Sequence, residues 1–125
     1  MGSSQTHTEI KIGNDPRLAA ALDAVLEQSG CRLGLNDATL AKLQAAVREA
    51  CKTVWRSLNG TNEKLHVDCE EFPDRLELLF GCTGASTSEI EACIAELKSK
   101  VDRVTFETRS GKPELKLVKY AARHQ

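Results

Sequence analysis

The run LAKLQAAVREACKTVWRSL, residues 40–58, carries the polar side chains with the clearest potential for chemistry. Its apolar residues recur at helical spacing, and one acid, Glu49, lies beside the apolar stripe. Thr53 and Ser57 follow at i+4 and i+8, so the three polar side chains share one helix face.

A glycine-containing segment, Gly81-Cys82-Thr83-Gly84-Ala85, follows two short alternating runs. An acid-bearing helix, a hairpin and a glycine turn, in this order, form the nucleotide pocket of one class of proteins. We expect Gly81 and Gly84 to serve a tight turn from strand to helix. Cys82 allows two interpretations, a structural thiol or a reactive one whose pKa is lowered by the following helix N-terminus.

The other residue types that could do chemistry are not arranged for it. The cysteines are odd in number and show no C-x-x-C spacing, which favours reduced thiols in a cytoplasmic protein over a disulfide framework or a zinc site. The three histidines are scattered and match no catalytic triad. We therefore predict no metal site. The five cysteines are Cys31, Cys51, Cys69, Cys82 and Cys93.

Length and composition predict a single soluble domain. The chain has 125 residues, of which 41% are hydrophobic and 28% are charged. A formal net charge of −1 gives no overall field that would steer it to nucleic acid or to an anionic membrane. No signal peptide or membrane-spanning run is visible. We expect a disordered N-terminus at 1–7, one domain at 8–120 and a C-terminal tail at 121–125.

Periodicity and turn residues predict the elements that position these side chains. Gly30 is expected to stop the first helix, and Asn36 or Asp37 to cap the second, which Asn59-Gly60 ends. The order is β-α-α-β-β-α-β-β, which indicates an α/β (α+β) two-layer sandwich with the helices on one face of a mixed sheet. The expected elements are a strand at 8–12, helices at 16–28, at 40–58 and from 87, and hairpins within 65–80 and 104–117.

Over about residues 8–120 the chain resembles the anti-sigma-factor serine kinases of the GHKL (histidine-kinase-like) ATPase superfamily. IKIGNDPRLAAALDAVLEQSGCRLGLNDATLAKLQAAVREAC is similar to the first strand and two helices of that family, and VDRVTFETRSGKPELKLVKY to its closing hairpin. The resemblance implies the histidine-kinase-like ATPase fold.

The chemistry of that family lies partly in a Glu-Ala-x-x-Asn-Ala-x-x-His box on the second helix. In the family the Glu is a general base and the Asn binds the magnesium ion of ATP. Glu49 matches the Glu, and Ala50 matches the following Ala. Thr53 stands at the Asn position and Ser57 at the His position. A Thr hydroxyl is a single, weaker ligand on a shorter side chain.

The second box of the family, Asp-x-Gly-x-Gly, aligns with the segment from Gly81 to Ala85, and its adenine-reading Asp is missing. A site without this acceptor should lose adenine specificity on the order of 10²-fold. The family then has a long loop with a phosphate-binding segment. Here only Ser86 separates Ala85 from the next helix cap at Thr87. The resemblance is thus to a shortened member with a degenerate ATP site.

Three functions remain open. The first is an anti-sigma regulatory factor that binds a sigma factor, an anti-anti-sigma (STAS) protein or a second copy of itself, and requires no cofactor. The alternative is an active serine/threonine protein kinase that uses Glu49, ATP and Mg²⁺ to phosphorylate an anti-anti-sigma protein. The third is a module that senses another small molecule in the vacated pocket. A partly exposed Trp55 would be a plausible interface anchor.

Overall fold

The computed structural model describes residues 6–12, 17–58, 65–82, 87–109 and 111–121, with three helices and five strands in these ranges. The helices are α1 (Arg17–Arg32), α2 (Asp37–Ser57) and α3 (Thr87–Lys98). The strands are β1 (Thr6–Ile12), β2 (Leu65–Phe72), β3 (Arg75–Gly81), β4 (Arg103–Arg109) and β5 (Lys112–Tyr120). None of these helices is long and apolar enough to cross a membrane.

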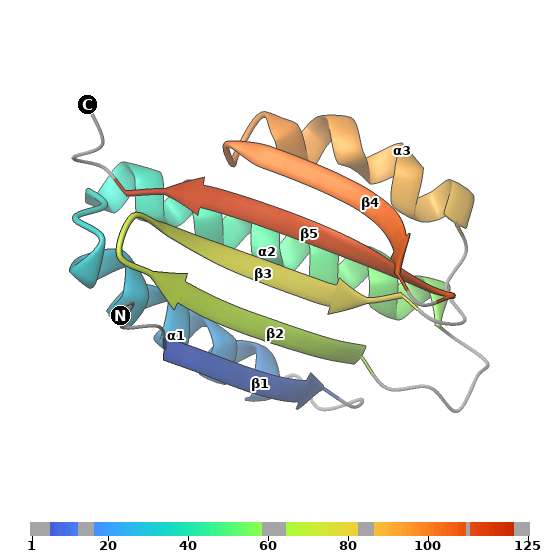
Figure 1. Ribbon diagram of the computed structural model, residues 1–125, viewed down its shortest axis with the longest axis horizontal. Coiled ribbons are helices and arrows are strands. Elements are labelled where there is room, and N and C mark those ends of the chain that lie inside the picture. Colours follow the sequence, from blue (N-terminus) through green and yellow to red (C-terminus); the bar gives the residue numbers. More distant parts are fainter. Residues whose placement is uncertain (1–5, 13–16, 59–64, 83–86, 110, 122–125) are drawn as a thin grey trace.

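The strands form one sheet in the order β1-β2-β3-β5-β4, and the helices cover one of its faces (Figure 1). The α+β class is therefore confirmed. The expected mixed sheet is wrong, because every neighbouring pair is antiparallel. The strands β3 and β4, which α3 connects, do run in the same direction. However, β5 lies between them, as β2 lies between β1 and β3, so no parallel pair forms.

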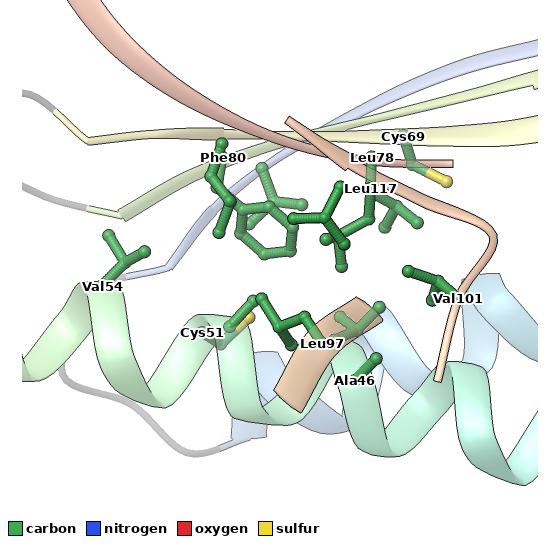
Figure 2. Packing of buried hydrophobic residues seen from close by; sticks show 14 of the residues in the cluster. Ala46, Cys51, Val54, Cys69, Leu78, Phe80, Leu97, Val101 and Leu117 are labelled. Carbon is green, nitrogen blue, oxygen red and sulfur yellow. The ribbon is translucent and has the colours of Figure 1, made fainter. Parts of the chain in front are cut away.

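The core lies between the sheet and α2, whose buried side chains include Ala46, Val47, Ala50 and Val54. In β3, buried and half-buried residues alternate, as expected for a strand with one covered face. Figure 2 shows Leu78, Phe80 and Leu117 of the sheet pointing toward the helix layer. The fully buried residues of β3 and β5 are Leu76, Leu78, Phe80, Leu115 and Leu117.

The end of α1 differs from the expectation. The helix continues through Gly30, which is buried, and a Cβ at this position would lie 2.9 Å from Leu40 Cδ1. Gly30 thus allows α2 to approach closely. The helix instead ends before Gly34, whose φ of 77° is left-handed. Leu35 N–H donates to Gly30 O at 2.9 Å and Gly34 N–H to Cys31 O at 3.1 Å, which is the Schellman arrangement.

The start of α2 confirms the predicted cap. Asn36 has extended backbone angles, and its side-chain oxygen accepts a hydrogen bond from Thr39 N–H at 2.8 Å. At the other end, Leu58 is the C-cap. The helix end predicted at Asn59-Gly60 lies outside the described residues, and β1 begins at Thr6, two residues earlier than expected.

An ion pair joins the end of α1 to β2. Arg32 donates from Nε and Nη2 to the Glu71 carboxylate at 2.7–3.0 Å, and the buried Ser29 Oγ donates to the same group at 3.1 Å. The hydrogen bond from Arg32 is the main reason that the pKa of Glu71 is lowered, and burial opposes it. The contact fixes α1 on the outer strands of the sheet.

Replacing Gly34 by Ala should lower the free energy of unfolding by about 1 kcal/mol, because a Cβ disfavours a positive φ. Gly81→Ala is the matched control. Gly81 lies in β3 and its added Cβ would meet only His66 Cβ, at an ordinary 3.6 Å. Urea denaturation measures both variants. Equal effects of the two substitutions would contradict the assignment of Gly34 as the helix-ending residue.

Glu71→Gln should lower stability at pH 7, and its difference from the parent should shrink in acid. The folded pKa of Glu71 lies below its ordinary value of 4.5. Its contribution is therefore complete above that value and is lost as the pH falls through the folded pKa. Denaturant midpoints at pH 7 and at about pH 3.5 test this. Glu91→Gln, at an exposed position of α3, should have little effect at either pH.

Candidate functional site

The predicted pocket residues of α2 lie on the helix face that contacts α3. Thr53 is 2% exposed, Ser57 is half-buried, and Glu49 is half-buried. Arg56 lies on the rim of this contact, where its Nε is 3.8 Å from Glu89 Oε1 of α3. The sequence spacing thus brings the three side chains to one face, as predicted, and α3 packs on that face.

Cys93 of α3 lies near two of these α2 side chains, Thr53 and Glu49. Burial raises the pKa of its thiol, the nearby Thr53 hydroxyl lowers it, and the negative charge of Glu49 raises it. Thr53 and Glu49 therefore both lie close to Cys93, in the seam between α2 and α3. These two residues, together with Ser57 and Cys93, form the α2–α3 seam.

Two hydroxyls in the α2–α3 seam are buried without a hydrogen bond of standard geometry. They are Thr53 Oγ1 and Ser57 Oγ, one helical turn apart. The Thr53 hydroxyl influences the Cys93 thiol, but their contact falls short of that geometry. A buried hydroxyl without a partner costs free energy relative to an apolar side chain of the same shape. These groups are therefore unusual residues for a helix–helix contact.

The seam does not fit a magnesium–nucleotide complex. Thr53, which the resemblance aligns with the metal-binding Asn, is buried against α3 and offers no oxygen to a cleft. The other seam residues are the Cys93 thiol, the half-buried Glu49 carboxylate and the buried Ser57 hydroxyl, so only one of them is a charged oxygen ligand, whereas a magnesium ion needs an open octahedral site of oxygen ligands. No step of phosphate transfer can be built from these residues.

The glycine segment also differs from the expected turn. Gly81 is the last residue of β3 and pairs with His66 of β2 and Glu114 of β5. The prediction that Gly81 belongs to a strand-to-helix turn is therefore wrong. The physical reason is that β5 extends the sheet pairing to the end of β3. Gly84 lies outside the described residues.

Cys82 is a structural thiol, and the reactive alternative is wrong. The residue is 1% exposed, its Sγ donates to Phe80 O at 3.4 Å, and burial raises its pKa to about 11. Cys51 and Cys69 are also buried, and burial raises the pKa of each to about 12. Of the five cysteines, Cys31 is the exposed one, and all five are free thiols.

A shallow groove of about 270 Å³ lies on the sheet face opposite the helices. Its walls are the outward residues of β3, β5 and β4. Glu77 is its central acid and contacts Arg75 Nε at 2.7 Å and Lys116 Nζ at 3.4 Å. Burial would raise the pKa of Glu77, but the hydrogen bond from Arg75 and the charge of Lys116 outweigh it and lower the pKa.

Sequence reasoning missed this groove. Its signal was present in the alternation of strands 75–81 and 112–120, whose polar members include charged residues of both signs. A solvated sheet face gives the same pattern, so alternation alone does not separate the two. The charges at its centre are paired with one another, and the groove therefore presents a polar, nearly neutral surface.

Comparisons with known proteins were made for the whole chain. No protein-family model matches it, and no curated protein matches it.

Thr53→Val should keep or raise the stability, by up to about 1 kcal/mol, because it keeps the side-chain shape and removes a buried hydroxyl whose contact with the Cys93 thiol falls short of standard hydrogen-bond geometry. Thr53→Asn, which introduces the residue found at this position in the family that the chain resembles, should destabilise by about 1–3 kcal/mol because the larger side chain must fit against α3. Thermal unfolding measures both. A stabilising Thr53→Asn would mean that this position faces open space.

Proposed function

We propose that this chain is a non-catalytic regulatory protein that acts by binding another protein. It would use the frame of an anti-sigma-factor kinase without the nucleotide chemistry of that class. The observation that carries the proposal is the burial of Thr53, at 2% exposure, in the α2–α3 seam. A helix face that packs against another helix can stabilise the domain, but it cannot hold ATP at the same time.

The partner follows from the resemblance stated above, to proteins that bind sigma factors and anti-anti-sigma proteins. A surface near the C-terminal end of α2 supports a protein ligand. Trp55 is half-buried there, next to the exposed Arg56 and Lys52. Tryptophan and arginine are enriched among the residues that dominate protein interfaces. This surface lies on α2, the helix that also carries Thr53, so a bound partner would contact α2 directly.

Titration with ATP and Mg²⁺ separates this proposal from the kinase alternative. We expect no saturable change of Trp55 fluorescence up to about 1 mM nucleotide, because the family's magnesium position is closed. Isothermal calorimetry should give the same result. Micromolar affinity, together with phosphorylation of a STAS protein that Glu49→Gln abolishes, would restore the kinase alternative.

Binding to purified regulators tests the proposal directly. We expect a one-to-one complex with a sigma factor or STAS protein encoded beside this chain, detected by calorimetry. Trp55→Ala and Arg56→Glu should each weaken it at least tenfold, since such residues contribute most of the affinity of an interface. Lys42→Ala, an exposed position near the other end of α2, is the control. If none of these regulators binds, the proposed function is wrong.

A further inference from the structure

The strand β4 is an edge of the sheet, and among the described residues no strand pairs with its outer row of backbone groups. Cys82 N–H donates to Pro113 O at 3.0 Å, so the backbone groups of Pro113 face β3. This hydrogen bond fixes which residues of β5 direct their backbone groups toward β3 and which toward β4. Odd-numbered residues of β5 bond to β3, and even-numbered ones bond to β4. In β4, Arg103, Thr105 and Glu107 therefore bond to β5. The N–H and C=O groups of the intervening Val104 and Phe106 point away from β5, toward the open edge of the sheet.

The sequence of this edge is complementary to itself when it is read in the opposite direction. Residues 103–107 are Arg-Val-Thr-Phe-Glu. Two copies paired antiparallel about Thr105 would place Arg103 opposite Glu107 and Val104 opposite Phe106. The outward backbone groups of Val104 and Phe106 would then form the hydrogen-bonded pairs. Arg103 and Glu107 would form a non-hydrogen-bonded pair, in which the side chains come closer together.

The charges favour this register over others. Arg103 and Glu107 are both exposed, and neither forms an ion pair within the described part of the chain. Charged side chains usually protect an edge strand from pairing. A parallel alignment in register would place Arg103 against Arg103 and Glu107 against Glu107. The antiparallel alignment about Thr105 instead pairs opposite charges twice.

The apolar residues of the edge would also gain cover. Val104 is 8% exposed, and Phe106 and Ile94 are half-buried at the margin of the core. The side chains of Arg103, Thr105 and Glu107 line the groove on the face opposite the helices. Since side chains alternate along a strand, those of Val104 and Phe106 point to the helix side of the sheet. In the antiparallel pair, Phe106 of each copy would contact Val104 of the other.

We propose that two copies of this chain associate through their β4 edges, antiparallel about Thr105, so that the two sheets become one. The occupant of the edge is thus a second copy, selected by the complementarity of Arg103 and Glu107. This interface uses neither the α2–α3 seam nor Trp55, and it holds whether or not the proposed function is correct.

Charge reversal with mixing tests the proposal in analytical ultracentrifugation. The parent should form dimers in the micromolar range. Arg103→Glu or Glu107→Arg alone should weaken self-association at least tenfold, because each creates two like-charge pairs. An equimolar mixture of the two variants should form a heterodimer, in which every pair again has opposite charges. The double variant Arg103→Glu/Glu107→Arg should dimerise like the parent.

Analytical ultracentrifugation of a control variant tests whether the effect is specific to β4. Glu27→Arg, at an exposed position of α1, should leave the association unchanged. Circular dichroism verifies that each variant is folded, as expected for changes at exposed positions. The proposal is overturned by a parent that stays monomeric at about 100 µM, well above the expected dissociation constant. It is equally overturned by single variants that dimerise like the parent, or by a mixture that forms no heterodimer.

Discussion

The burial of one face of an antiparallel sheet under three helices is the constraint on which the rest of the structure depends. The central strand β3 places Leu76, Leu78 and Phe80 against the helix layer, all fully buried. Since side chains alternate strictly, a shift of one residue in register would turn these three toward solvent. The same alternation directs Arg75 and Glu77 to the opposite face, where they form the groove.

The elements could be predicted from the sequence because their signals are local. The α2 stripe, the cap at Asn36 and the alternation of 65–72 and 75–81 each come from neighbouring residues. The errors came from non-local effects. The sequence pattern predicts a helix stop at Gly30, but Gly30 is buried against Leu40, and Gly34 ends the helix. The insertion of β5 between β3 and β4 is likewise a property of topology and not of composition.

In the candidate site, too, the local features could be predicted and those that depend on tertiary packing could not. The spacing of Glu49, Thr53 and Ser57 was sufficient to place them on one helix face, because that follows from 3.6 residues per turn. What covers this face could not be predicted, since it depends on where α3 packs. Cys82 was ambiguous for a related reason. A thiol next to a helix start can be exposed or buried, and only the tertiary packing decides its pKa.

The unequal burial of the thiols has a practical consequence. Thiolates, not thiols, react with maleimides and oxidants, and burial of Cys51, Cys69 and Cys82 raises the pKa of each to about 11 or 12. Cys31, exposed in the last turn of α1, is therefore the natural attachment point for a single fluorophore or spin label. Cys93 is buried as well and burial also raises the pKa of its thiol, so the native fold favours labelling of Cys31 without removal of the other four cysteines.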